Sequence, residues 1–138
     1  MTNELELLIF IGGIVHFGVL IAGALLPFVL DWKTSLQKLD GLSREIVWVH
    51  YIFIALVIIS FGVLSVLFAG ALASGEILAR AVCLMIGCFW AARLLIQFFV
   101  FDARPYLSHG FLKAGYHGLT VVFTYQALVY SLAALLPR

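Results

Sequence analysis

Charged residues are scarce in this sequence, and their scarcity excludes most water-soluble folds. Asp, Glu, Lys and Arg make up 11% of its 138 residues, whereas hydrophobic types make up 64%. A soluble domain is about a quarter charged. A water-soluble fold would have to expose much of the apolar surface, at a cost of roughly 25 cal/mol per Å². The composition therefore indicates that lipid surrounds most of the chain.

Apart from Arg93, charged residues are missing altogether from four long stretches, which cover residues 7–30, 46–75, 81–101 and 114–137. A hydrocarbon core about 30 Å thick needs roughly 20 helical residues, so each stretch is long enough to span it. Only helices and closed barrels satisfy the backbone in lipid, and the period-two alternation of barrel strands is missing. We therefore predict four transmembrane helices, at about 5–30, 45–68, 76–101 and 111–136.

Short connections between these segments predict antiparallel neighbours and an all-α, up-down-up-down four-helix bundle in a single transmembrane domain, residues 1–138. The linker 31–44 is polar, with Leu36, Leu39 and Leu42 at helical spacing, so we expect it to lie along the membrane interface. Ser43 is the expected N-cap of the second helix.

Two tandem helical hairpins are a second interpretation of the same bundle. Residues 28–31 and 99–102 close the first and third helices with similar sequences, and His-Tyr or Tyr-His pairs at 50–51 and 116–117 lie near the starts of the helices that follow. A duplicated hairpin produces such a pattern. Chance produces it as well, because Phe and Val are abundant.

Several function classes are disfavoured by what is absent. The net charge is only +1, which gives no reason to expect a nucleic-acid partner. Cys83 and Cys88 lie about 140° apart on one helix and match neither a disulfide nor a zinc spacing. No set of nucleophile, base and orienting acid and no phosphate-binding loop occurs, so a hydrolase or kinase is disfavoured. Glu4 and Glu6 without a basic residue predict a retained first helix rather than a signal peptide.

Basic residues predict the orientation. The first linker holds Lys33, Lys38 and Arg44 and the last holds Arg104 and Lys113, whereas the opposite side has only two arginines. The positive-inside rule then places both linkers in the cytoplasm and both termini outside.

Polar and small residues inside the spans fall into stripes with helical spacing, which predicts four faces that line one interior. The stripes are Gly12, His16 and Gly23; His50, Val57 and Leu64; Cys83, Gly87, Trp90, Arg93 and Gln97; and His117, Thr120, Thr124 and Ser131. Small residues four apart, Gly18 with Ala22 and Gly87 with Ala91, permit close helix approach.

His50 and His117 lie at matching depths on diagonal helices, so these two imidazoles are candidate ligands of a b-type haem iron. His16 lies near the midplane, which disfavours a tri-histidine metal site. Ordinary structural histidines that bond a carbonyl, or histidines that handle protons or a quinone, remain alternatives.

Arg93 is the most informative residue, because a permanent cation in an apolar span needs a partner or an escape to water. Candidate partners are Gln97, Asp31 or Asp102 by snorkelling, a lipid phosphate, or an anionic ligand. With the histidines, Arg93 and Gln97 complete the candidate haem-binding or quinone-binding set.

An aromatic segment, 98–107, carries Asp102, Arg104 and Tyr106 and faces the same interface as Asp31 and Trp32. An aromatic belt with a local ion pair is one interpretation, and a docking surface is the other.

The run from Trp90 to Pro105, taken with the Asp31-Trp32 helix end, resembles small uncharacterised four-span proteins of bacterial inner membranes. The resemblance covers most of the chain and implies a bacterial inner-membrane location. It singles out Arg93, Gln97 and Asp102, and it implies no activity.

Three functions are consistent with these patterns. The favoured one is a non-catalytic accessory or assembly subunit of a larger membrane complex, with other membrane subunits or further copies of the chain as partners. The second is a redox module that binds haem b or a quinone. The third is a small oligomeric transporter or channel with Arg93 and Gln97 along a polar path, which the lack of an intramembrane acid disfavours.

Overall fold

The computed structural model describes residues 2–29, 31–99 and 110–136, and its regular elements are all helices. They are α1 (Thr2–Ala24), α2 (Leu26–Val29), α3 (Trp32–Ser35), the 3₁₀ turn η1 (Leu36–Lys38), α4 (Gly41–Leu67), α5 (Ala69–Leu72), α6 (Ile77–Phe99) and α7 (Gly110–Leu135). The helices α1, α4, α6 and α7 are long and apolar enough to cross a membrane. The predicted all-α class with four spans is confirmed.

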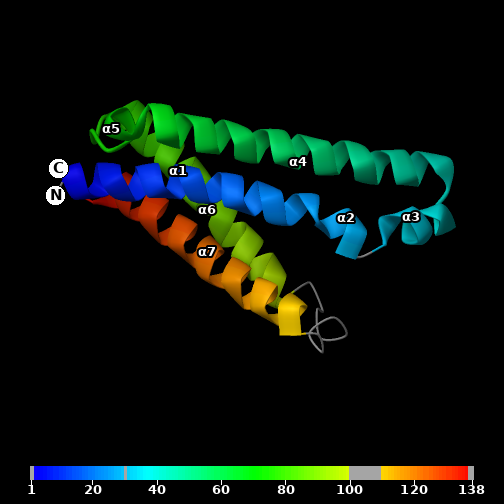
Figure 1. The fold of residues 1–138 in the computed structure, drawn as a ribbon. Helices are drawn as coiled ribbons and strands as arrows, with labels where there is room; N and C mark the ends of the chain where they lie inside the picture. Colours follow the sequence, from blue (N-terminus) through cyan, green and yellow to red (C-terminus); the bar gives the residue numbers. More distant parts are fainter. Residues whose placement is uncertain (1, 30, 100–109, 137–138) are drawn as a thin grey trace.

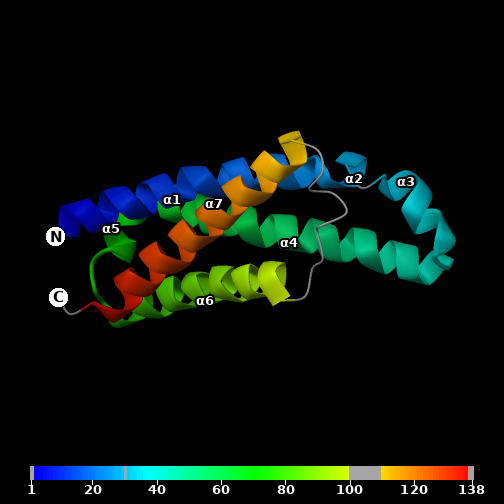
Figure 2. The same cartoon turned by 90° about the horizontal axis from the view of Figure 1, so that it is seen from below.

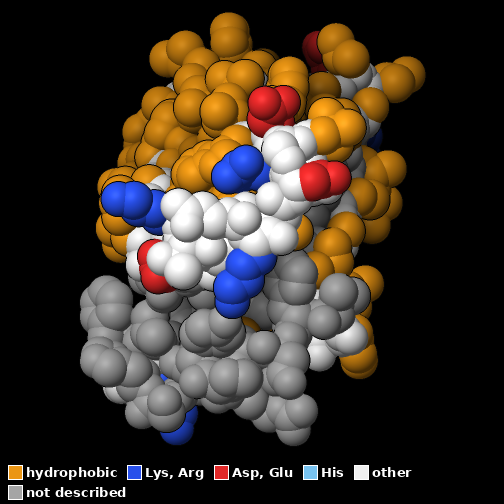
Figure 3. Space-filling view, turned by 90° about the vertical axis from the view of Figure 1, so that its right-hand side faces the viewer, with side chains coloured by type: hydrophobic (Ala, Val, Ile, Leu, Met, Phe, Trp, Pro, Cys, Tyr) orange, Lys and Arg blue, Asp and Glu red, His pale blue; other side chains and the backbone are white. Residues whose placement is uncertain are grey.

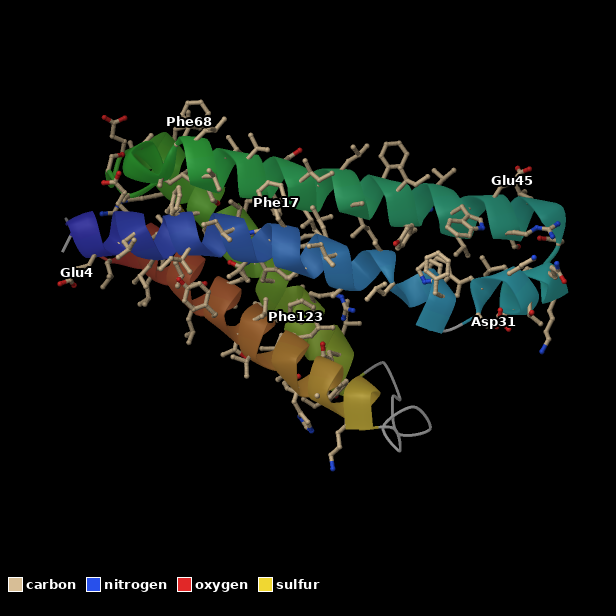
Figure 4. The ribbon with its side chains drawn as sticks, viewed as in Figure 1. Glu4, Phe17, Asp31, Glu45, Phe68 and Phe123 are labelled. Atoms are coloured by element: carbon tan, nitrogen blue, oxygen red, sulfur yellow. The ribbon has the colours of Figure 1, made fainter. Side chains whose placement is uncertain are left out.

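The four long helices alternate in direction, so the chain forms an up-down-up-down bundle (Figure 1). The start of α1 and the end of α7 lie at one end, here called the terminal end, and α3 lies at the opposite, linker end (Figures 1 and 2). Glu4 and Phe68 mark the terminal end, and Asp31 and Glu45 mark the linker end (Figure 4).

Two helical hairpins make up the bundle. The most extensive helix contacts join α1 to α4 and α6 to α7, and α1 also packs on α7. The hairpins meet at the terminal end and diverge toward the linker end (Figure 1). The buried residues of α4, which are Ile58, Phe61, Gly62 and Ser65, accordingly all lie in its second half. The tandem-hairpin geometry is therefore present, whereas its origin by duplication stays a prediction.

The first helix ends earlier than predicted because of Pro27. Proline has no N–H, so the Gly23 carbonyl receives no helical bond from residue 27. The Tyr51 hydroxyl of α4 donates to that carbonyl instead, at 2.6 Å. After Ala24 the next hydrogen bonds join residues three apart: the Leu25 N–H donates to the Ala22 carbonyl at 3.2 Å, and the Phe28 N–H donates to the Leu25 carbonyl at 3.1 Å. The hydrogen bond from Tyr51 to the Gly23 carbonyl therefore joins α4 to α1.

The predicted second helix, α4, begins earlier than predicted, and its cap is a different residue. Asp40 is the N-cap, since its Oδ1 accepts from the Ser43 N–H at 2.8 Å, so Ser43 lies inside the helix. At the terminal end, α5 occupies part of the expected turn. Arg80 closes this end by donating to Gly75 O at 2.8 Å and to Ala134 O at 3.1 Å.

Glycines set how closely the paired helices approach. A Cβ on Gly13 would lie 2.8 Å from both Ser65 Cβ and Val66 Cγ2, so α1 and α4 are in contact there. A Cβ on Gly87 would lie 2.7 Å from Ser131 Oγ, which confirms the predicted close approach at this residue. Gly18 has open space around it, so the prediction for Gly18 is wrong.

We expect Gly13→Ala to destabilise the bundle relative to Gly18→Ala, although both changes lie on α1 and both remove the same helical penalty of glycine, about 1 kcal/mol. The added methyl group at residue 13 must push α4 away, which costs about 1 to 3 kcal/mol. Thermal unfolding of the two variants in one detergent measures this difference. Equal midpoints would contradict the close approach of α1 and α4.

The cap of α4 predicts a pH dependence. Hydrogen bonds from Ser43 hold the pKa of Asp40 below its usual value of 3.8. A lowered pKa means that the folded state prefers the carboxylate, so this stabilisation is present above that value and is lost as pH falls through the lowered pKa. Asp40→Asn keeps a capping oxygen but does not titrate. Between pH 6 and pH 3 the melting midpoint of wild type should therefore fall by more than the melting midpoint of Asp40→Asn does.

Candidate functional site

Five polar or amphipathic side chains are almost completely buried in the bundle, and they come from all four long helices. This core polar cluster consists of His16 of α1, Ser65 of α4, Trp90 of α6, and Gln126 and Tyr130 of α7. Each of them is at most 1% exposed. Burial in an apolar bundle favours hydrogen bonds among such groups, because no water is there to satisfy them. One atom of the cluster, Gln126 Oε1, is buried and has no hydrogen-bond partner among the described residues.

The hydrogen bonds of His16 fix its protonation. Trp90 Nε1 lies 2.8 Å from His16 Nε2, and an indole N–H is only a donor, so Nε2 must be an unprotonated acceptor. The proton of the imidazole then resides on Nδ1, which donates to Gly12 O at 2.7 Å; Gln126 Nε2, another donor, lies 3.0 Å from the same nitrogen. His16 is therefore neutral, and a second proton on the ring would break the bond to Trp90.

The Gly12 carbonyl accepts a second hydrogen bond, from Gln126 Nε2 at 3.0 Å, so α1 and α7 are joined at the same oxygen. Position 12 must be small, since a Cβ there would lie 3.0 Å from both Gln126 Oε1 and Tyr130 Oη. The Tyr130 hydroxyl forms a short hydrogen bond with the Ser65 hydroxyl, which joins α7 to α4.

Aromatic rings enclose these polar contacts. The Trp90 ring stacks on Phe123 at 5.1 Å and meets Phe89 edge-on at 5.0 Å. The His16 ring has edge contacts to Tyr130 at 5.7 Å and to Phe61 at 6.1 Å. Phe61 also packs on Phe89 at 5.3 Å, so α4 reaches α6 through this layer. The core polar cluster is thus the place where the two hairpins are joined.

Of the predicted site residues, Arg93 and Gln97 lie on the α6–α7 hairpin. Gln97 is buried, and its Nε2 donates to Thr120 Oγ1 of α7. The Arg93 side chain is partly buried, and its guanidinium carbon lies 5.2 Å from the centre of the Phe123 ring. This cation–π contact, typically worth about 0.5 to 2 kcal/mol, is a partner that the sequence did not indicate.

The structure does not bring His50 and His117 together. Both side chains are exposed, and His50 Nδ1 bonds the carbonyl of Ile46 in its own helix at 2.9 Å. They lie near the starts of α4 and α7, which belong to different hairpins and are far apart in Figure 1. A haem iron with two histidine ligands needs both imidazoles at its axial positions, which the placement of these residues on separate hairpins does not favour.

The remaining predicted interface residues lie at the linker end or beyond the described part of the chain. Asp31 is exposed and has a left-handed backbone with φ 51°, and Trp32 packs on Trp48 of α4 at 5.3 Å. Asp102, Arg104 and Tyr106 lie outside the described residues. Within residues 2–29, 31–99 and 110–136, no three His, Cys, Asp or Glu side chains are grouped to hold a metal ion.

Sequence reasoning found His16 and Trp90 but missed Ser65, Gln126 and Tyr130. The predicted stripe on α7 is shifted: Thr120 and Thr124 are only partly buried and donate to carbonyls of their own helix, at 3.0 and 2.8 Å. The four-residue spacing of Gln126 and Tyr130, continued by buried Ala133 and Ala134, is the signal that would have located the inner face.

Comparison of the chain with protein-family models, with curated proteins and with solved structures gives no match. The fold and the core polar cluster define the class on their own: an integral membrane helical bundle whose buried polar groups hold two hairpins together. The cluster contains no carboxylate and no thiol, and its histidine has both nitrogens engaged.

A double-mutant cycle tests whether the core polar cluster joins the hairpins. We expect Ser65→Ala and Tyr130→Phe to be coupled by about 0.6 to 1.7 kcal/mol, the range measured for hydrogen bonds between membrane helices. Unfolding in detergent provides the free energies. The matched control pairs Ser65→Ala with Tyr125→Phe, because the Tyr125 hydroxyl bonds Leu8 O at 2.8 Å rather than Ser65. Equal coupling in the two cycles would rule out a specific bond.

Proposed function

We propose that the protein is a non-catalytic accessory or assembly subunit of a larger membrane complex. The observation that carries the proposal is the uneven packing of the bundle. None of residues 41–57 of α4 and 113–122 of α7 is buried, so these parts of the two helices pack less closely within the chain than the parts nearer the terminal end do. A transmembrane helix of a partner subunit would cover these surfaces.

The composition of the core supports the same proposal. Its polar side chains are neutral, and their hydrogen bonds run between helices, which stabilises a scaffold and supplies no acid, base or nucleophile. Gln97 is engaged with Thr120 and Arg93 lies over Phe123, so neither favours a polar path for transport. A haem or quinone module is less well supported, because His50 and His117 are separated.

The orientation proposed with this function places the linker end on the cytoplasmic side of a bacterial inner membrane. Lys33, Lys38, Arg44 and Lys113 lie toward this end in the chain, and Arg80 lies at the other. The distribution of basic residues supports this orientation by the positive-inside rule. The bacterial location derives from the resemblance noted for the sequence.

Photo-crosslinking in native membranes tests the proposal. A photoreactive phenylalanine analogue would replace Phe53, in the loosely packed half of α4, or Phe68, at the terminal end; the two side chains are 61% and 53% exposed. We expect a reproducible adduct with one membrane protein at position 53 and none at position 68. A tagged form of that protein should in turn isolate this chain in mild detergent.

Three other outcomes would contradict the proposal. Adducts with lipid alone at both positions would mean that lipid covers the surface of α4. Adducts only with a second copy of the chain would indicate a homo-oligomer instead. A haem or quinone that co-purifies and is lost in His50→Ala would favour the redox alternative.

A further inference from the structure

A groove of about 510 Å³ opens at the linker end, between the segment that follows α1 and the start of α4. Its lining includes apolar side chains of Phe28, Trp32 and Trp48, together with the charged side chains of Lys33 and Arg44. Figure 3, which views the molecule from this end, shows Lys, Arg, Asp and Glu side chains gathered beside hydrophobic ones. The groove is therefore amphipathic and lies where a spanning helix meets the membrane surface.

Packed aromatic rings form one wall of the groove. Trp32 meets Trp48 edge-on at 5.3 Å, and both rings also contact Tyr51, at 5.2 and 5.9 Å. The bond from the Tyr51 hydroxyl to Gly23 ties this group to α1. Indole rings favour the level of lipid headgroups, because one edge is polar and the rest is apolar.

The groove is lined by more positive than negative side chains. Lys33 and Arg44 contribute two cations and Asp31 one carboxylate, so the lining carries a net charge of +1. A guanidinium binds a phosphate through two parallel hydrogen bonds, and an ammonium adds a third charged donor. Phe28 is 82% exposed, so an apolar surface lies directly beside these donors.

We propose that this groove is a binding site for an anionic phospholipid. The phosphodiester lies between Lys33 and Arg44, and the glycerol and first methylene groups of the acyl chains lie on Trp48 and Phe28. The single negative charge of the lipid matches the net charge of the lining. The site depends only on the bundle spanning a membrane, so it stands whether or not the proposed partner subunit exists.

The test uses delipidated wild-type protein in a neutral detergent, with dioleoyl phosphatidylglycerol or dioleoyl phosphatidylcholine added, and native mass spectrometry to count bound lipid. We expect phosphatidylglycerol to bind about tenfold more tightly, which corresponds to about 1.4 kcal/mol. The double variant Lys33→Gln/Arg44→Gln should lose this preference. Lys38→Gln is the matched control for the single variants Lys33→Gln and Arg44→Gln, because Lys38 is an exposed cation of the same linker and does not line the groove.

A gain-of-affinity variant keeps the proposal falsifiable even if the double variant folds poorly. Asp31→Asn removes the carboxylate from the groove, and asparagine also tolerates the left-handed backbone at this position. We expect it to bind phosphatidylglycerol several-fold more tightly than wild type does. Phosphatidylglycerol should also raise the melting temperature of wild type more than phosphatidylcholine does.

Several results would overturn the proposal. Equal binding of the two lipids by wild type would remove any selectivity for anionic lipid. A loss in Lys38→Gln equal to that in Lys33→Gln or in Arg44→Gln would indicate diffuse attraction by the basic linker. Unchanged or weaker phosphatidylglycerol binding by Asp31→Asn would show that the phosphodiester does not lie beside this carboxylate.

Discussion

A polar group buried in hydrocarbon has no water to satisfy it, and the fold depends on the hydrogen bonds that the core polar cluster forms between helices. The bond between Trp90 and His16 joins α6 to α1, and the bond between Tyr130 and Ser65 joins α7 to α4. Apolar contacts between lipid-facing helices are nearly indifferent to rotation, because lipid tails are as apolar as leucine. Hydrogen bonds are directional, so they select which faces of the helices meet.

Small residues lie beside the core polar cluster. Together with its hydrogen bonds, they explain why the helices pack closely toward the terminal end and not toward the linker end. Gly12, Gly13 and Gly62 allow α1 to lie directly against its neighbours, and Gly87 does the same between α6 and α7. Toward the linker end, the corresponding contacts are made by large rings such as Trp32 and Trp48. The hairpins therefore separate where neither small residues nor polar bonds hold them together, and none of residues 41–57 of α4 or 113–122 of α7 is buried.

The depth of a residue along its helix is readable from sequence, but the inward-facing side of a helix and the pairing of helices in space are not. His50 and His117 do lie at comparable positions in their helices, yet the divergence of the hairpins separates them. The stripe predicted on α7 omits Gln126 and Tyr130, because a short shift in the phase of a helix changes which stripe faces inward. The sequence indicates that the buried charge of Arg93 needs a partner. That Phe123 is such a partner depends on how α6 lies against α7.

The sequence alone determined the all-α class, the four spans, their alternating direction and the amphipathic linker, because these follow from hydrophobicity, helix length and loop length. Helix ends depended on single residues whose effect needs a partner, as with Pro27 and the Tyr51 hydroxyl. Only the tertiary structure decided that His16 is a neutral acceptor, that the hairpins diverge, and that Lys33 and Arg44 share a groove. Each of these is a relation between residues far apart in the chain, and a one-dimensional pattern contains no distances.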